Sequence, residues 1–374
     1  MGEFDMKVNK TSPHSILMAT DINGNSKDAV FFDGLKANIR KLTSKSETKG
    51  LFTVKPANKW IEESKLKPIP RMLFGEFWFE NELCIMFADT NQGKSILAVQ
   101  IGNSISKGEQ IPGVKLEVDS QIVLYFDFEL SAKQFESRYS IKNEVEKRFE
   151  DHYLWSDNFI RVEINPRTDV PEGTSFELYL NQSLEQAINE TKARVLIIDN
   201  LTYLKSDTEK SKDAAPLVKG LQSLIDKYNC SILVLAHTPK RDLSKPITRN
   251  DLQGSKRLID FCDSAIAIGE SHTDKNVKYF KQIKVRAMEF MYDSENVVVC
   301  QLHKPYNFLM FEFLSFGTEK EHLRQYTEKD KEQRITDVVE LKQQGLSNVE
   351  IARKFGVSEG AIRKWIKKAD NNES

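Results

Sequence analysis

The residues with the clearest potential for chemistry lie in the stretch ADTNQGKS, residues 88–95. A glycine followed by a lysine and a serine at the start of a helix can bind phosphate, because the glycine lets backbone N–H groups approach the phosphate oxygens. Lys94 would neutralise the β- and γ-phosphates of a nucleotide, and the Ser95 hydroxyl would bind Mg²⁺. Ala88 stands where the usual G-x-x-x-x-G-K-[ST] pattern has its first glycine. Taken alone, the stretch also fits a strand–turn–helix with an incidental lysine.

A second motif, VLIIDN at residues 195–200, strengthens the case for a nucleotide site. Its apolar run ends in Asp199, and a carboxylate at the end of a buried strand can help to hold Mg²⁺ through water. Together the two motifs predict a P-loop site for ATP and Mg²⁺, in which Ser95 and Asp199 bind the metal ion. The residues expected to bind the nucleotide are those of the loop: Ala88, Asp89, Thr90, Asn91, Gln92, Gly93, Lys94 and Ser95.

Hydrolysis of ATP also needs a carboxylate that orients or deprotonates the attacking water. The residue that follows Asp199 is Asn200, so this carboxylate must come from another part of the chain. Glu129 is the candidate, because it lies just beyond the apolar run QIVLYFDF, residues 121–128. The alternative for Glu129 is an ordinary solvated carboxylate in a loop.

Short apolar runs predict the strands that position these residues. They are rich in Ile, Val, Leu or Phe, which is typical of strands buried on both faces of a parallel sheet. The helical pattern at 214–228 separates two of them and predicts crossover connections. Two further runs, 277–285 and 296–303, predict an antiparallel hairpin that extends the sheet. The parallel runs occupy residues 83–88, 121–128, 159–164, 195–199, 231–236 and 264–269.

The segment ELSAKQFESR, residues 129–138, resembles a signature of RecA-like hexameric helicases of the DnaB type, S-L-E-M-S-x-x-Q-L-x-x-R. The matching residues are Glu129, Ser131, Gln134 and Arg138. The resemblance implies that Glu129 is the catalytic carboxylate. It also implies that Arg138 lies over the nucleotide base, a role shared with the small plasmid RepA-type helicases. An exposed helix residue is the alternative for Arg138.

The run SILVLA continues into His237, where members of that family place a glutamine or histidine that senses the γ-phosphate. The following loop, residues 238–255, is similar to the family's central-channel loop, which tracks single-stranded DNA by phosphate contacts. The alternatives are a histidine with ordinary hydrogen bonds at a strand end and a solvated charged loop. The basic residues of the loop are Lys240, Arg241, Lys245 and Arg249.

A further match is the K-x-R formed by Lys284 and Arg286. Ile283 and Val285 alternate with these two residues, so a strand would bury one pair and expose the other. In the family this K-x-R reaches into the ATP site of the neighbouring subunit. The resemblance therefore implies that Arg286 is an arginine finger with Lys284 beside it. An exposed pair of charges on an edge strand is the alternative.

The C-terminal stretch LSNVEIARKFGVSEGAIRKWIKK, residues 346–368, has the pattern of a helix-turn-helix. Ser347 and Glu350 form a capping box at the start of its first helix. The three-helix pattern resembles the DNA-binding domains of resolvases and transposase-like proteins, which predicts contacts from Arg363 and Lys364 to duplex DNA. Units of this kind also mediate protein contacts.

Four segments are expected along the chain. They are a partly disordered N-terminal arm (1–60) with a short helix near 33–43, a RecA-like ATPase domain (61–317), a polar linker (318–332) and a helix-turn-helix domain (333–370). The helicase motifs occur in the correct order within the second segment. The predicted fold class is therefore α/β, with a RecA-like P-loop core, a mainly parallel sheet and a small all-α C-terminal domain.

Composition limits the remaining possibilities. The net charge of −1 over 374 residues predicts no general affinity for nucleic acid, so any DNA contact must come from local patches. The four cysteines are far apart and form no C-x-x-C pair, which favours a reducing cytoplasm over a zinc site or a disulfide framework. No apolar run approaches the ~18 residues that would span a membrane.

The sequence as a whole predicts an ATP-hydrolysing, DNA-associated motor of the RepA/DnaB helicase type, acting in replication or mobilisation of a plasmid or mobile element. Because Arg286 is useful only in a neighbour's site, a homo-oligomeric ring is expected, with six copies as the family implies. Single-stranded DNA would pass through the ring channel and duplex DNA would bind the helix-turn-helix. The alternatives are a recombination-type ATPase that forms filaments and a nucleotide-gated DNA-binding regulator with little hydrolysis.

Overall fold

The computed structural model describes residues 52–165, 167–200, 215–238, 241–252, 256–325, 328–355 and 357–372. The helix expected near 33–43 and most of the expected N-terminal arm lie outside these residues. The chain divides into two compact units between Ile69 and Pro70. In the first unit, helix α2 spans Ala57–Ser64.

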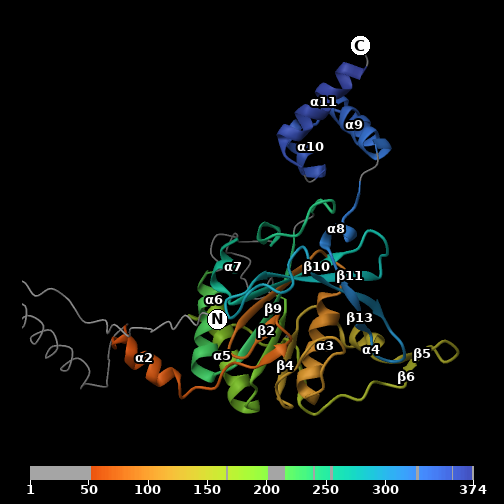
Figure 1. The fold of residues 1–374 in the computed structure, drawn as a ribbon. Helices are drawn as coiled ribbons and strands as arrows, with labels where there is room; N and C mark the ends of the chain where they lie inside the picture. The colour runs from red at the N-terminus through yellow and green to blue at the C-terminus, as the bar shows by residue number, and fades with distance from the viewer. Residues whose placement is uncertain are drawn as a thin grey trace, which may run out of the picture. The chain divides into compact units, whose positions relative to one another are not determined.

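The second unit is built on a nine-stranded sheet in the order β13-β12-β11-β10-β3-β9-β8-β4-β7 (Figure 1). Its parallel strands are β10 (Ser264–Glu270), β3 (Leu83–Ala88), β9 (Ser231–His237), β8 (Val195–Asp199), β4 (Val123–Asp127) and β7 (Phe159–Val162). Its antiparallel extension consists of β11 (Val277–Lys284), β12 (Val297–His303) and β13 (Met310–Gly317). The predicted α/β class, the mainly parallel sheet and the antiparallel hairpin are confirmed.

Both faces of the parallel sheet are covered. In β3, Leu83, Ile85 and Phe87 belong to one hydrophobic core, whereas Cys84 and Met86 belong to the other. This double burial explains why the strands read as unbroken apolar runs in the sequence. One core is completed by α3 (Lys94–Lys107), and the other by α5 (Phe176–Thr191), α6 (Ala215–Tyr228) and α7 (Lys256–Phe261).

The order of the strands decides where the functional side chains meet. Strand β9 lies between β3 and β8, and β4 follows β8 on the far side. Because these strands are parallel, their carboxyl ends lie at one edge of the sheet, where ligands bind in open α/β sheets. That edge therefore carries the loop after β3, Asp199, His237 and the residues after β4.

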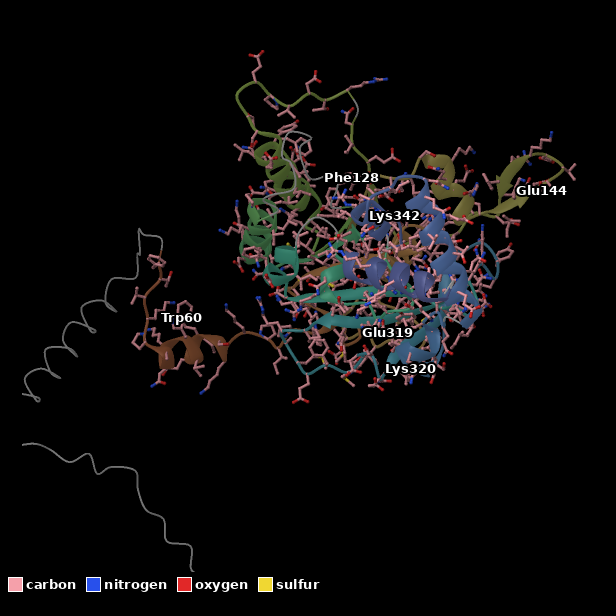
Figure 2. The ribbon with its side chains drawn as sticks, turned by 90° about the horizontal axis from the view of Figure 1, so that it is seen from above. Trp60, Phe128, Glu144, Glu319, Lys320 and Lys342 are labelled. Carbon is pink, nitrogen blue, oxygen red and sulfur yellow. The ribbon has the colours of Figure 1, made fainter. Side chains whose placement is uncertain are left out.

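Smaller elements complete the second unit. Figure 2 labels Glu144 at the tip of the projecting hairpin that β5 and β6 form. These elements are β1 (Met72–Phe74), β2 (Trp78–Phe79), α4 (Ala132–Arg138), β5 (Ile141–Asn143), β6 (Arg148–Glu150), the 3-10 turn η2 (Arg249–Asp251) and α8 (Glu319–His322).

The C-terminal region contains three helices around a small core. Ser347 Oγ accepts a hydrogen bond from the backbone N–H of Glu350, and Glu350 Oε2 accepts from the backbone N–H of Ser347, which confirms the predicted capping box. The core residues are Val338, Ile351, Ala352 and Ile362. The helices are α9 (Glu328–Gln343), α10 (Asn348–Phe355) and α11 (Glu359–Asn372). None of the helices described along the chain has the length and apolar character needed to cross a bilayer.

Candidate active site

The loop after β3 tolerates Ala88 because the alanine does not need an unusual backbone. Ala88 is the last residue of the strand and is buried, whereas the left-handed positions described in this loop are Asn91 (φ 63°) and Gly93 (φ 85°). A Cβ at Gly93 would also lie 2.6 Å from the ring of Phe311. Glycine is therefore required at position 93 and not at position 88.

Lys94 is buried and is bent back onto its own loop. Its Nζ donates to the carbonyl oxygens of Ala88 and Asp89, each at 3.1 Å, and lies 3.2 Å from Nδ1 of His237. Burial lowers the pKa of Lys94, and the carboxylates of Asp199 and Glu129 oppose that shift. The lysine thus makes contacts that a nucleotide phosphate can replace.

The predicted metal residues Ser95 and Asp199 lie together. Asp199 is almost fully buried at the end of β8, and Tyr125 Oη donates to its Oδ2 at 2.8 Å. Burial raises the pKa of Asp199 to about 6, although a hydrogen bond from Ser95 opposes the shift. A hydroxyl and a carboxylate are the hard oxygen donors that Mg²⁺ prefers, so these residues fit the ion.

Glu129, His237 and Lys94 meet at one edge of the sheet, where His237 ends β9, Glu129 follows β4 and Lys94 begins the helix after β3. Glu129 Oε1 lies 3.2 Å from His237 Nε2 and accepts a hydrogen bond from Asn200 Nδ2. A charged lysine has no lone pair, so it donates to Nδ1 of a neutral His237, and the matching tautomer carries its proton on Nε2, which faces Glu129. The predicted sensor therefore connects the phosphate-binding lysine with the predicted base.

Asn200 and Tyr125 are site residues that the sequence did not point to. Asn200 is buried and also lies 3.1 Å from His237 Nε2, while Tyr125 donates to Asp199. Asn200 follows the apolar run of β8 directly, whereas Tyr125 lies in the middle of β4. Nothing in the sequence tells which residue either side chain would face.

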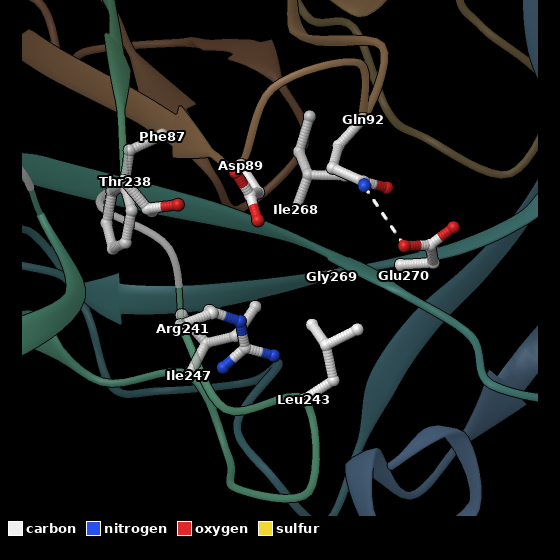
Figure 3. A pocket seen from close by; sticks show the side chains of 10 residues that line it. All are labelled: Phe87, Asp89, Gln92, Thr238, Arg241, Leu243, Ile247, Ile268, Gly269 and Glu270. Carbon is white, nitrogen blue, oxygen red and sulfur yellow. Dashed lines mark hydrogen bonds between the residues drawn. The ribbon is translucent and has the colours of Figure 1, made fainter. Parts of the chain in front are cut away.

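A small pocket joins the P-loop to the segment that follows β9 (Figure 3). Asp89 and Gln92 line it on the loop side, and Arg241 lines it from the segment after β9. Gln92 Nε2 donates to Glu270 Oε2 at 3.1 Å, and Arg241 Nη1 donates to the carbonyl of Lys245 at 3.0 Å. Arg241, expected to contact DNA, lies half-buried against the nucleotide loop.

The other basic residues expected to contact DNA differ in their surroundings. Lys245 is exposed and lies 3.8 Å from Asp242, and Arg249 is exposed in η2. Lys240 lies outside the described residues. In the C-terminal region, Lys364 is exposed, and Arg363 is exposed but forms an ion pair with Glu359 at 2.7 Å. Their contacts with DNA remain predictions.

The segment after β9 is fastened to the sheet by a buried acid, Glu319, which Figure 2 labels. Its Oε1 accepts from the backbone N–H of Ile247 at 2.7 Å and from Tyr279 Oη at 3.1 Å. Its Oε2 accepts from Lys281 Nζ and, at 2.8 Å, from Ser294 Oγ. Glu319 thus ties the candidate DNA loop to β11 and to the start of α8.

The expectation that Arg286 lies on the exposed face of a strand is wrong. Strand β11 ends at Lys284, and Arg286 lies in the segment beyond it, where its Nη1 pairs with Asp263 Oδ1 at 2.6 Å. The acid is available because β10 begins at Ser264, beside the end of β11. Lys284 Nζ donates to the carbonyls at the end of α7. The finger role stays a prediction.

Arg138 is the last residue of α4 and is half-buried. Its Nη1 is shielded from solvent and has no hydrogen-bond partner among the described residues. In that part of the chain no hydrogen bond or ion pair joins Arg138 to Lys94, Glu129 or His237. A contact between Arg138 and a nucleotide base is therefore still a prediction.

Two protein-family models match parts of the chain. The family model described as an AAA domain matches residues 53–242, and a model described as a helix-turn-helix domain matches residues 336–372. No curated protein matches the chain. One similar solved structure is a KaiC-like protein from the hyperthermophilic archaeon Pyrococcus horikoshii OT3. It is 11% identical, with a TM-score of 0.42, and the match covers 63% of this chain and 90% of that chain.

Proposed function

The chain belongs to the AAA domain family, and from this premise we propose that it hydrolyses ATP as a DNA-associated motor of the RepA/DnaB helicase type. Its P-loop ATPase domain is joined to a helix-turn-helix domain. The observation that supports hydrolysis most is the meeting of Lys94, His237 and Glu129 at one edge of the sheet.

Substrate binding begins with an exchange of partners at Lys94. The phosphates of ATP take the place of the two loop carbonyls as acceptors for its ammonium, and the N-terminal N–H groups of α3 point at the same phosphates. Ser95 and Asp199 would hold Mg²⁺, which supplies positive charge to the phosphate oxygens. This end of the sheet therefore binds and orients the nucleotide.

Glu129 then acts on the attacking water. Its carboxylate orients the water and takes its proton as the water oxygen bonds to the γ-phosphorus. The bond between that phosphorus and the β–γ bridging oxygen breaks, and ADP leaves. His237 reports the state of the site, because its Nδ1 loses a hydrogen-bond donor when Lys94 turns toward the phosphates. The next residues along the chain lead into the loop that carries Arg241 and Lys245.

The proposed work on DNA uses two surfaces. Lys240, Arg241, Lys245 and Arg249 contact single-stranded DNA in the channel of a ring, which we expect to contain six copies. Arg363 and Lys364 of the helix-turn-helix contact duplex DNA. Arg286 leaves Asp263 and enters the ATP site of the neighbouring copy. The motor serves replication or mobilisation of a plasmid or mobile element.

Nucleotide titration and hydrolysis assays test this function together. We expect the wild-type protein to bind ATP, to hydrolyse it faster when single-stranded DNA is present, and to separate a forked duplex. Lys94→Ala should abolish ATP binding, whereas Lys115→Ala, which removes an exposed lysine paired with Glu117, should not. Wild-type protein that binds ATP and DNA without turnover would favour the nucleotide-gated regulator.

A further inference from the structure

Asp127 is a buried carboxylate that the nucleotide motifs do not explain. It is the last residue of β4, and only 3% of it is exposed. Its Oδ1 accepts from the backbone N–H of Glu129 at 3.2 Å and from that of Leu130 at 2.9 Å. An aspartate that accepts from the backbone two and three residues ahead closes a tight turn. The side chain of Asp127 therefore sets the backbone from which Glu129 extends.

Arg161 holds the other side of this turn. It lies on β7, the edge strand beside β4, opposite Tyr125. Its Nε and Nη2 reach Asp127 Oδ2 at 2.9 and 2.8 Å, and Nη2 also donates to the carbonyl of Leu130 at 2.7 Å. The guanidinium lies over the ring of Phe135, 4.7 Å from its centre. Both ends of the turn are thus tied to one rigid, planar group.

The same arginine balances charge at the site. Asp127 and Asp199 occupy matching positions on neighbouring strands, and Glu129 lies two residues after Asp127. A buried carboxylate without a partner is strongly unfavourable, so Asp127 needs a cation close by. Lys94 contacts His237 and the carbonyls of its own loop, and among the described residues no hydrogen bond or ion pair joins it to Asp127. Because Arg161 pairs with Asp127 and not with Glu129, the carboxylate of Glu129 is available for the substrate water.

We propose that Arg161 is a positioning residue for hydrolysis, which acts through Asp127 and the turn at Leu130 to aim the carboxylate of Glu129. The proposal rests on the proposed function, since it assumes that Glu129 is the base. Arg161 acts without touching the nucleotide. Its removal should therefore change the rate of hydrolysis and leave the affinity for ATP nearly unchanged.

Arg161→Lys is the most direct test. Lysine keeps the positive charge, but it cannot make the guanidinium's simultaneous hydrogen bonds to Asp127 and to the carbonyl of Leu130. A misplacement of about 1 Å can cost about 10²-fold in rate, so we expect kcat to fall at least about 10-fold. The Kd for ATP should change less than about 3-fold, because the residues that contact bound ATP are unchanged. Arg148→Lys, in the projecting hairpin, is the matched control.

A double-mutant cycle separates positioning from general damage to the fold. In a Glu129→Gln background the base is already gone, so Arg161→Lys should cause little further loss of kcat. Equal losses in both backgrounds would show that Arg161 only supports the fold. An unchanged kcat in the single variant would also overturn the proposal.

A second variant covers the case in which Arg161→Lys does not fold. Asp127→Asn keeps an oxygen for the turn and weakens the pairing with Arg161, so kcat should fall while ATP still binds. Full activity of a folded Asp127→Asn protein would contradict the proposal. If Glu129→Gln itself kept full turnover, the assignment of the base in the proposed function would fail, which is a different result.

Discussion

Lys94 and His237 are in direct contact, with Nζ of the lysine 3.2 Å from Nδ1 of the histidine. The contact joins the start of α3 to the end of β9, and the second ring nitrogen of His237 lies 3.2 Å from Glu129. Binding of a phosphate at Lys94 must therefore change the hydrogen bonding of the predicted base. A change at the phosphate can therefore pass from Lys94 through His237 to the carboxylate of Glu129.

Arg286→Ala should bind ATP nearly normally and hydrolyse it poorly, since arginine fingers contribute about 10³–10⁵ in rate. Asp263→Asn is the control, because it frees Arg286 from its ion pair and should not lower turnover. Mixing Arg286→Ala with Glu129→Gln should restore part of the activity, since some interfaces of a mixed ring have both groups intact. Two variants that assemble together and stay inactive at every ratio would exclude a finger acting between copies.

Glu319→Ala should lower the free energy of unfolding by about 3–5 kcal/mol, because it leaves Lys281 charged and buried without its partner. Glu321→Ala removes a nearby exposed carboxylate and should change the free energy of unfolding by less than about 0.5 kcal/mol. Urea unfolding followed by circular dichroism measures both. Equal effects of the two variants would show that the Glu319 contacts contribute nothing specific.

The region around α8 should weaken in acid because of His322. Burial lowers the pKa of His322 from its ordinary value of 6.5, although Glu321 opposes the shift. Since the folded pKa is lowered, the neutral histidine contributes stability above 6.5, and this contribution is lost as the pH falls through the lower folded value. His322→Phe can keep the stacking on Tyr279 and should show a smaller loss of Tm between about pH 7 and pH 5.

The control for this experiment is His272→Asn, because His272 is exposed. It should keep the pH dependence of the wild-type protein. A His322→Phe protein whose Tm falls with pH as steeply as the wild type would rule out His322 as the source. Thermal scans at several pH values provide the comparison.

Removal of residues 326–374 should leave ATP binding intact and abolish tight binding of duplex DNA. The cut falls after Arg324, whose backbone N–H still donates to the carbonyl of Leu243, so the attachment near Glu319 is kept. Arg363→Ala in the full chain should weaken duplex binding and reduce its dependence on salt, because one phosphate contact is lost. Undiminished binding by the truncated chain, measured by fluorescence anisotropy, would place the duplex site elsewhere.

The sequence predicts the framework of this site well, for a physical reason. A strand buried on both faces has to be apolar throughout, so β8 could be delimited as Val195–Asp199 from the sequence alone. The polar residue that ends such a strand is then visible against the apolar run. Asp199 and His237 were identified in this way.

The side chains that pair with one another around the site were harder to predict, because the two members of a pair come from distant parts of the chain. Asp263 lies 23 positions before Arg286, and the pairing of β10 with β11 brings it close. Asp127 and Arg161 meet only because β7 lies beside β4 in the sheet. Strand spacing within one segment shows which side chains share a face, but it does not show which strand lies next to them.

Glu129→Gln is the variant that tests the central claim most directly. Glutamine keeps the shape of the side chain and cannot accept the proton of water. Single-turnover and steady-state hydrolysis, measured beside the Kd for ATP, should show nearly normal binding and a turnover reduced by about 10²-fold or more. Turnover that stays at the wild-type level while Lys94→Ala abolishes binding would show that the nucleotide site is real and that Glu129 is not its base.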